Sequence, residues 1–416
     1  MSYALLPMLA VSNLLRRACY SLLCLHLSYS GAFADPEVSK VWGQQKVPTY
    51  KVDIFYDLSE AATVSLAVSA DGGANWGIVR VDSCSLDIGT NVTAGTGKHI
   101  LWDAGTDWPG QYSSAVRFKV TATACAPDPS IPVGMVLIRA GSFQMGDNLG
   151  DGWSAEVPVH TVYVSAFYMD RTEVTWGKWK EVRTWSATRG YDIGSVGSGK
   201  ADNHPVQSVN WYDCIKWLNA RSEMEGLTPC YRRGGVVYKA EQHDDIVCAW
   251  SANGYRLPTE AEWEKAARGG LSGRRFPWGD TIQHTRANYY SSAGYAYDTS
   301  ATPGFHPSYA TDFPPNFPLT NPVGAFAANG YGLHDMAGNL LEWCWDWFDD
   351  YPSGSVSNPH GPSSPSGSWG SNRVIRGGSW GADGARRCRV AFRDNYRPDY
   401  MHYIIGFRAV RPPGQQ

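Results

Sequence analysis

The sequence predicts an α+β protein in which an all-β sandwich precedes a larger, loop-rich domain. Two observations support this prediction. Between residues 47 and 124, short runs of alternating apolar and polar residues, at 51–58, 63–68, 77–81 and 116–121, are separated by Gly-rich turns, which is typical of antiparallel strands. Beyond residue 132 the alternation gives way to two amphipathic helical segments and to long stretches rich in Gly, Pro and Tyr. The 416 residues are enough for two or three domains.

The overall composition narrows the class of protein. Aromatic residues make up 13% of the chain, with 18 Trp, 44 Gly and 25 Pro, which favours a loop-rich fold held by large side chains. Charged residues make up only 18%, and the formal net charge is −3. The chain as a whole therefore lacks the basic character of a nucleic-acid binder or of a polybasic membrane binder.

The domain boundaries follow from changes in composition. Residues 36–125 form the predicted sandwich, in which the turn-containing segment 69–76 is similar to hairpins of secreted immunoglobulin-like modules. Such a module would act as a spacer or adhesion unit. Residues 126–132 form the predicted linker, because their closely spaced prolines keep the chain extended. Residues 133–413 form the second domain.

Residues 1–34 are predicted to be a signal peptide. Arg16 and Arg17 precede an apolar run at 18–27 and a small-residue site that ends at Ala34. The apolar residues before Arg16 raise the alternative that translation starts at Met8 or later. The run is shorter than the roughly 20 residues that a membrane span needs, and no later segment is long and apolar enough. We therefore expect a secreted, periplasmic or cell-surface protein with no integral membrane span after signal cleavage.

Two of the nine cysteines lie in the predicted signal peptide, which leaves an odd number in the mature chain. Cys84 could pair with Cys125, and Cys230 with Cys248, because each pair lies within one local unit. The alternative is that these are buried free thiols.

The second domain contains two segments with the pattern of amphipathic helices. Residues 210–219 place their large apolar side chains on one face. Residues 258–268 begin with Thr259 as the N-cap and Glu262 as its capping-box partner, and Gly-Gly at 269–270 ends the helix.

Two acidic residues flank a bend in the stretch 331–347. Asp335 and Glu342 lie on either side of the Gly338-Asn339 turn, so their carboxylates can converge on one point. Together with the carbonyls of Gly338 and Leu340 they would supply the oxygen ligands that Ca²⁺ prefers. The alternative is a simple Gly-Asn turn between core strands, with both acids in solvent.

A series of ordered motifs accompanies this stretch. Together they resemble the formylglycine-generating-enzyme (sulfatase-modifying-factor) family, which has a C-type-lectin-like fold, over roughly residues 133–411. The motifs are Gly-Met-Val-Leu-Ile at 134–138, Gly-Ser-Phe-Gln-Met-Gly at 141–146, Glu-Val-Thr at 173–175, His-Pro-Val-Gln-Ser-Val-Asn-Trp at 204–211, Arg-Leu-Pro-Thr-Glu-Ala-Glu-Trp-Glu at 256–264, Pro-Trp-Gly-Asp at 277–280, Arg-Gly-Gly-Ser-Trp at 376–380 and Gly-Phe-Arg at 406–408.

The resemblance implies a second structural Ca²⁺. Asn288 matches a family position that offers a side-chain oxygen to the ion, with Asp312 or Asp298 as its partner, although the spacing departs from the family here. The alternative is an Asn that caps a turn.

The resemblance also bears on catalysis. Enzymes of the family hold Cu(I) with two cysteines shortly after the Arg-Gly-Gly-Ser motif and use O₂ to convert a sulfatase cysteine to formylglycine. In this chain the two positions fall on Ala382 and on or near Ala385, and Ala cannot replace a soft thiolate ligand. Cys388 follows without a partner. We therefore expect no copper site, and a binding or recognition module rather than an oxidase.

Two alternatives to that function stay open at this point. One is a copper-dependent oxidase in which the fold brings Cys388 close to Cys344 or Cys230. The other is a structural envelope protein. The flanking arginines could lower the pKa of Cys388, but the apolar residues at 390–392 favour a buried strand cysteine.

The segment 380–405 is rich in residues that recognise ligands, and it resembles the variable region of retroelement-diversified binding proteins with this fold. Rigid aromatic rings and charged side chains are typical of recognition faces. The alternative is an ordinary polar loop. We expect the segment to contact a protein or glycan ligand through Trp380, Asp383, Arg386, Arg387, Asp394, Asn395, Tyr396, Arg397, Asp399, Tyr400, His402 and Tyr403.

Overall fold

The structure is a computed structural model. The residues that it describes are 36–46, 49–59, 62–76, 79, 81–92, 95–124, 131–310, 319–365, 369–381 and 384–413. The predicted signal peptide, most of the predicted linker, Cys125, Asp312 and Asp383 lie outside these ranges. No helix within these ranges combines the length and the apolar character that a membrane span requires.

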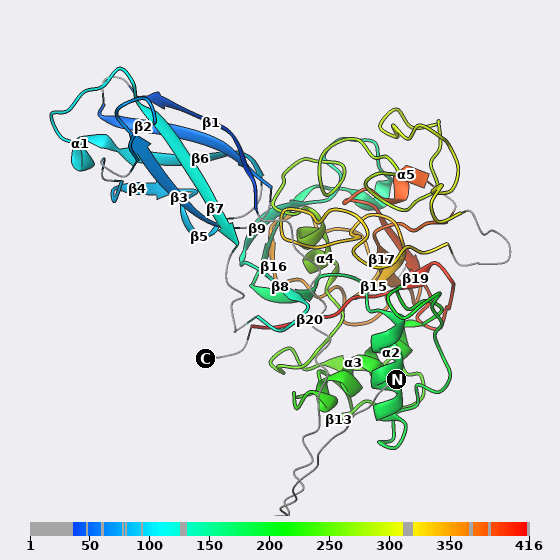
Figure 1. Ribbon diagram of the computed structural model, residues 1–416. Coiled ribbons are helices and arrows are strands. Elements are labelled where there is room, and N and C mark those ends of the chain that lie inside the picture. Colours follow the sequence, from blue (N-terminus) through cyan, green and yellow to red (C-terminus); the bar gives the residue numbers. More distant parts are fainter. Residues whose placement is uncertain are drawn as a thin grey trace, which may run out of the picture. The chain divides into compact units, whose positions relative to one another are not determined.

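Residues 36–124 form two antiparallel sheets (Figure 1). The first sheet has the order β1-β2-β6-β4, with β1 (Val38–Gln45), β2 (Lys51–Leu58), β6 (Gly95–Asp103) and β4 (Cys84–Leu86). The second has the order β5-β3-β7, with β5 (Gly89–Val92), β3 (Ala62–Ser69) and β7 (Arg117–Ala124). A short helix, α1 (Ala104–Asp107), follows β6.

Alternation in the sequence explains how these sheets pack. Every second residue of β2, such as Ile54 and Tyr56, is buried, and so is every second residue of β3, such as Val64 and Leu66. These side chains belong to one hydrophobic cluster. The strands expected at 51–58 and 63–68 are thereby confirmed, whereas the strand expected at 77–81 falls largely outside the described residues. Membership of the immunoglobulin-like class stays a prediction.

Residues 131–413 combine small sheets with long irregular connections. Their strand orders are β16-β10-β9, β20-β11-β8, β13-β12-β14 and β18-β17-β15-β19. The elements are β8 (Met135–Ile138), β9 (Gly141–Met145), the 3₁₀ helix η1 (Ser154–Glu156), β10 (His160–Val164), β11 (Phe167–Asp170), α2 (Trp176–Ser186), α3 (Trp211–Met224), β12 (Tyr231–Arg233), β13 (Val236–Val237), β14 (Val247–Cys248), α4 (Glu260–Ala267), β15 (Leu341–Trp347), β16 (Val356–Ser357), β17 (Arg373–Arg376), α5 (Gly384–Arg387), β18 (Arg393–Tyr396), β19 (Ile405–Gly406) and β20 (Val410–Arg411).

The helix termini follow local capping signals. Helix α4 begins after Thr259, whose hydroxyl accepts a hydrogen bond from the Glu262 N–H at 3.2 Å, and the Glu262 carboxylate accepts one from the Thr259 N–H at 2.8 Å. This confirms the expected capping box. Helix α3 has an analogous box between Asn210 and Asp213 and continues to Met224, beyond the expected end.

Helix α2 is an element that the sequence pattern did not predict. The Thr175 hydroxyl caps it by accepting a hydrogen bond from the Lys178 N–H at 3.1 Å. Only Trp179, Val182 and Ser186 are buried, so the apolar stripe is narrow and interrupted by charged residues. Such a stripe gives a weak helical period.

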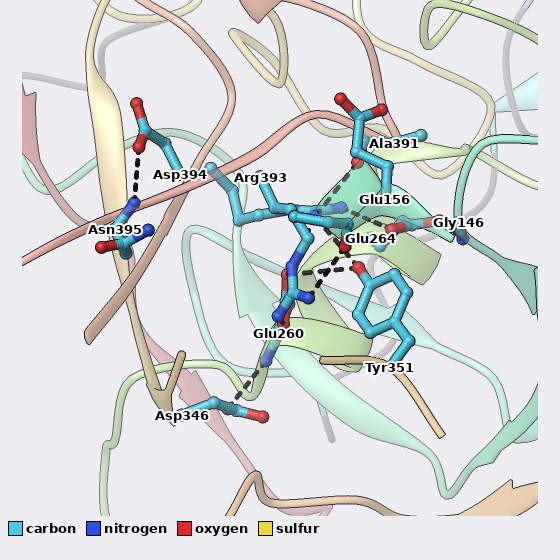
Figure 2. Close-up of polar contacts among 12 residues, drawn as sticks. Gly146, Glu156, Glu260, Glu264, Asp346, Tyr351, Ala391, Arg393, Asp394 and Asn395 are labelled. Atoms are coloured by element: carbon cyan, nitrogen blue, oxygen red, sulfur yellow. Dashed lines mark hydrogen bonds and ion pairs between the residues drawn. The ribbon is translucent and has the colours of Figure 1, made fainter. Parts of the chain in front are cut away.

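A buried charge network joins α4 to the sheet β18-β17-β15-β19. From β17, Arg376 donates to Glu264 at 2.5 Å and to Glu260 at 3.0 Å. From β18, Arg393 donates to both carboxylate oxygens of Glu260, at 2.7 and 2.6 Å. In Figure 2 the Arg393 side chain reaches Glu260, whereas Asp394 lies away from this network. The network therefore fixes the backbone of β18 from its inner side and leaves alternate side chains outside.

Candidate functional site

Aromatic rings of the C-terminal segment lie in one continuous row. Tyr396 stacks on Tyr400 with ring centroids 4.5 Å apart, and Tyr400 lies parallel to His402 at 5.8 Å. His402 contacts Tyr403 at 3.9 Å, and Tyr403 stacks on Trp380 at 5.6 Å. The structure thus brings together five of the residues expected in the ligand face, from both ends of the predicted segment.

Two residues that the sequence did not single out extend this row. The Phe305 ring lies 6.1 Å from the Trp380 ring, and the Tyr290 ring meets Phe305 edge to face at 4.9 Å. Both come from the long irregular stretch between α4 and β15, where no periodic pattern marks them. We call the seven residues Tyr396, Tyr400, His402, Tyr403, Trp380, Phe305 and Tyr290 the aromatic row.

Backbone hydrogen bonds position the part of the row that follows β18. The Trp211 N–H, at the start of α3, donates to the Pro398 carbonyl at 3.0 Å, and the Ser208 N–H donates to the His402 carbonyl at 3.2 Å. The Leu341 N–H, at the start of β15, donates to the Ile404 carbonyl at 2.9 Å. The main chain of the loop between β18 and β19 is therefore attached at three points, to α3, to the segment before α3 and to β15. Within the loop the side chains of Arg397, Asp399, Tyr400, Met401 and Tyr403 are exposed.

The aromatic row is buried at Trp380 and partly exposed at three of its tyrosines. Trp380 is only 3% exposed and packs with Leu319 and Leu340, so it supports the row rather than forming its surface. Tyr290, Tyr400 and Tyr403 are 36–37% exposed. Stacked rings cover one another's faces, so mainly ring edges and phenol hydroxyls reach solvent.

Charged residues beside the row pair with one another. Arg397 donates to both oxygens of Asp399, at 3.1 and 2.7 Å, and Arg387 donates to Asp394 at 2.8 Å. Burial raises the pKa of the Tyr396 phenol, and the neighbouring Asp394 charge adds to this effect. These two ion pairs give the face polar groups of both signs without a net charge of their own.

The remaining expected face residues have different surroundings. The Arg386 guanidinium lies over the Trp153 ring, 4.5 Å from its centroid, so in this structure its contact is outside the aromatic row. The side-chain oxygen of Asn395 accepts a hydrogen bond from Asn372 at 2.5 Å. Asp383 lies outside the described residues.

Cys388 is fully buried. Its side chain packs with Tyr289 and Ala385, and a Cβ at Gly378 would lie 2.8 Å from its sulfur. Burial raises the pKa of this thiol well above its usual range, so the favoured interpretation of Cys388 as a buried cysteine is confirmed and the alternative, in which the flanking arginines lower its pKa, is wrong. The residue also lies in a turn after α5, not in a strand. Among the described cysteines all are free, and none pairs with Cys388.

The two predicted calcium carboxylates have protein partners in this structure. Glu342 accepts hydrogen bonds from Arg408 at 2.7 and 2.8 Å and from Trp263 at 2.7 Å. Asp335 accepts from the Gly324 N–H at 2.7 Å and from Asn321 at 3.2 Å. This arrangement does not fit an ion shared by the two side chains, because Arg408 already neutralises Glu342. The calcium assignment stays a prediction.

The turn that contains Gly338 packs directly on Asn288. The Asn339 N–H donates to the Asn288 carbonyl at 2.8 Å, and a Cβ at Gly338 would lie 2.3 Å from the same oxygen. The Asn288 amide donates to the Leu319 carbonyl at 2.8 Å. Asp298 instead accepts hydrogen bonds from the Tyr289 hydroxyl and the Ser292 N–H. The contacts of Asn288 are thus those of a residue that holds a turn, and its calcium role also stays a prediction.

The leucine of the predicted calcium stretch, Leu340, is fully buried beside Trp380. This links the stretch 335–342 to the centre of the aromatic row. Within the described residues, no group of three or more His, Cys, Asp or Glu side chains is arranged to hold a metal ion.

The chain belongs to the class of proteins with a loop-rich α+β domain, and in this chain the C-terminal segment of that domain contains a row of aromatic side chains. Residues 121–413 match the family described as "Sulfatase-modifying factor enzyme 1-like domain", and the chain is a member of that family. The resemblance inferred from the motifs is thereby confirmed.

Particular relatives illustrate the range of the family. The chain is 34% identical over 329 residues to the formylglycine-generating enzyme of Streptomyces coelicolor, which covers 71% of this chain and 96% of that protein. It is 32% identical over 306 residues to a Bos taurus protein named inactive C-alpha-formylglycine-generating enzyme 2, covering 68% of this chain and 91% of the relative. The solved structure of Treponema denticola variable protein 1 aligns with a TM-score of 0.51 at 32% identity, over 67% of this chain and 95% of the other.

Proposed function

We propose that this chain is a recognition protein that binds a protein or glycan ligand with the aromatic row and lacks copper-dependent oxidase chemistry. The observation that carries the proposal is the row itself, in which Tyr290, Tyr400 and Tyr403 are partly exposed and Tyr403 stacks on the buried Trp380. Tyrosine combines a large rigid surface with a hydrogen-bonding hydroxyl and loses little conformational entropy on binding. Such side chains dominate the binding energy of many interfaces.

The way the segment is held supports this proposal. Arg393 points inward to Glu260, and the loop after β18 is attached through its main chain. Outward side chains such as Arg397, Tyr400 and Met401 can therefore be exchanged with little effect on the fold. This is what a variable recognition segment requires, and the name of the structural relative, variable protein 1, agrees with it.

The surroundings of Cys388 argue against the oxidase alternative. A Cu(I) site needs soft thiolate ligands, and this thiol is buried with a raised pKa and has no cysteine partner among the described residues. A relative that is itself named inactive is also consistent with family members that lack the enzymatic activity.

The remaining parts of the proposal concern where the protein works, what the two-sheet module does and whether Ca²⁺ is bound. We propose that residues 1–34 direct export, that the chain works in the periplasm, at the cell surface or outside the cell, and that the two-sheet module spaces or attaches the second domain. Structural Ca²⁺ bound near Asp335 or Asn288 is part of the same proposal and is tested separately below.

A binding experiment tests the function directly. The full chain and a Tyr400→Ala/Tyr403→Ala variant are immobilised and probed with a glycan array and a phage-displayed peptide library. We expect ligands of one class that the wild type retains and the double variant loses by at least tenfold in affinity. Tyr163→Ala is the matched control, because Tyr163 is a similarly exposed tyrosine on β10, outside the row.

The outcome that contradicts the proposal is ligand binding that the double variant and the control retain equally. Failure of the wild type to retain any member of either collection would contradict it as well. Melting curves of both variants show whether a loss reflects the face or the fold.

Two further observations separate the alternatives. Incubation with Cu(I), O₂ and a Cys-x-Pro-x-Arg peptide should produce no formylglycine, and product whose formation is lost in Cys388→Ser would restore the oxidase. A near-copy of the DNA that encodes residues 380–405, located in the same locus and differing mainly at adenines, would support diversification of the segment. If no such copy exists, the diversification proposal fails and the binding proposal stands on the array.

A further inference from the structure

We propose that Cys230 and Cys248 are a redox-active pair that closes to a disulfide and joins the start of β12 to β14. Neither cysteine belongs to the aromatic row, so this proposal does not depend on the proposed function. It assigns one cross-link among cysteines that the structure holds as free thiols.

Strand pairing brings the two residues together. Tyr231, the first residue of β12, lies directly opposite Cys248 of β14, and the Ala249 N–H donates to the Cys230 carbonyl at 2.8 Å. The two thiols are also close enough for each to shift the pKa of the other. Bridging requires Cα atoms within about 7 Å and side chains that face each other. Neighbouring positions of a hydrogen-bonded strand pair satisfy the distance. Cys230 precedes β12, so the regular alternation of strand faces does not hold its side chain on the face opposite to Cys248.

The surroundings make the two sulfurs unequal. The Cys248 thiol, the Arg256 guanidinium and the Gly254 N–H lower the pKa of Cys230, although burial opposes them. Burial raises the pKa of Cys248. Cys230 is therefore the thiol that ionises first, and thiolate is the nucleophilic form in disulfide exchange.

The reaction follows from this asymmetry and requires a disulfide oxidant, such as oxidised glutathione or a protein disulfide. The Cys230 thiolate attacks one sulfur of the oxidant and forms a mixed disulfide with it. The other sulfur of the oxidant leaves as a thiolate. Cys248 then loses its proton and attacks the Cys230 sulfur, which releases the second thiol of the oxidant. The pair loses two electrons and two protons, and the oxidant gains them.

Three other cysteines provide internal controls in the same chain. Cys214, Cys344 and Cys388 are fully buried, and burial raises the pKa of each thiol. Each is therefore expected to stay reduced under conditions in which Cys230 and Cys248 react.

Mass spectrometry of the full chain tests the proposal. The chain is equilibrated with oxidised glutathione, unfolded in guanidinium chloride with iodoacetamide and without reductant, and digested. We expect a cross-linked peptide that contains Cys230 and Cys248 and is two hydrogens lighter than the reduced pair, together with alkylated Cys214, Cys344 and Cys388. Alkylation of both Cys230 and Cys248 after this treatment would overturn the proposal.

Variants add an independent readout. Cys248→Ser should trap glutathione on Cys230, whereas Cys230→Ser should leave Cys248 without glutathione in the folded chain. The wild-type melting temperature should fall on addition of dithiothreitol, and that of Cys230→Ser/Cys248→Ser should not change. If these variants fail to fold, the wild-type peptide map decides the matter.

Discussion

Replacing Arg393 with Ala should strongly destabilise the C-terminal domain, and the structure allows the size of the effect to be worked out. The guanidinium is 2% exposed and donates to both oxygens of Glu260, at 2.7 and 2.6 Å. It also donates to the carbonyls of Ala155 at 3.0 Å and Asp349 at 2.8 Å. One side chain therefore neutralises a buried carboxylate and satisfies two backbone acceptors.

Truncation of one partner of a buried ion pair costs about 3–5 kcal/mol, because the other charge is left uncompensated. In Arg393→Ala, Arg376 still donates to Glu260 at 3.0 Å. We therefore expect a loss near the lower end of that range, about 3 kcal/mol. Arg393→Lys should lose less than Ala, because it keeps the charge but cannot form the two parallel hydrogen bonds.

Arg397→Ala is the matched control, because it removes the same side chain four residues away from a position that is 73% exposed. Its loss should stay within about 0.5 kcal/mol. Guanidinium denaturation followed by tryptophan fluorescence gives the unfolding free energy of each variant. Equal losses at the two positions, or a loss below about 1 kcal/mol at Arg393, would refute the reasoning that inward side chains such as Arg393 hold the fold while outward ones such as Arg397 do not.

Three other changes test separate parts of the structure. Burial and the neighbouring Glu260 raise the pKa of Asp346 from 3.8 to about 8. Between these two pH values the folded chain keeps a proton that the unfolded chain loses, so the unfolding free energy should fall as the pH rises. Asp346→Asn should remove that dependence, measured as unfolding free energy from pH 5 to 8, and an unchanged slope would contradict the assignment. Gly338→Ala should lower the unfolding free energy by about 1–3 kcal/mol, because φ at this residue is +86° and the new Cβ would meet the Asn288 carbonyl. Calorimetry measures the loss. Gly354→Ala is the control and should show no comparable loss, because Gly354 has open space around it. EGTA should lower the melting temperature and Ca²⁺ should restore it, because Ca²⁺ at a hundredfold excess over its Kd adds about 2.7 kcal/mol to the unfolding free energy. An unchanged melting curve would contradict the calcium proposal.

Features fixed by neighbouring residues were predictable from the sequence. The capping box of α4 depends on Thr259 and Glu262, three residues apart, and the alternation of β2 depends on its own side chains. Helix α2 was missed because its buried residues are few and its hydrophilic ones are mixed among them. Local sequence signals therefore predict capped helices and alternating strands well, but they miss helices whose apolar face is narrow.

Features that depend on distant contacts were only partly predictable. Tyr290 and Phe305 join the aromatic row from a stretch without periodicity, so nothing near them in sequence marks them. The apolar residues at 390–392 correctly indicated that Cys388 is buried, but they did not indicate that it lies in a turn rather than in a strand. Arg386 reaches Trp153, more than 230 positions earlier, which composition alone could not indicate.

The placement of charge explains how one segment can be both rigid and open to change. In β18, Arg393 faces the buried Glu260 carboxylate of α4, while the next residue, Asp394, forms a partly buried pair with Arg387. Strand geometry alternates the two sides, so a substitution on the outer side leaves the inner contacts intact. Beyond β18 the main chain itself carries the attachments, through the carbonyls of Pro398 and His402, and these are present whatever side chain is chosen. A scaffold built in this way separates stability from specificity, which is the physical condition that the proposed recognition face requires.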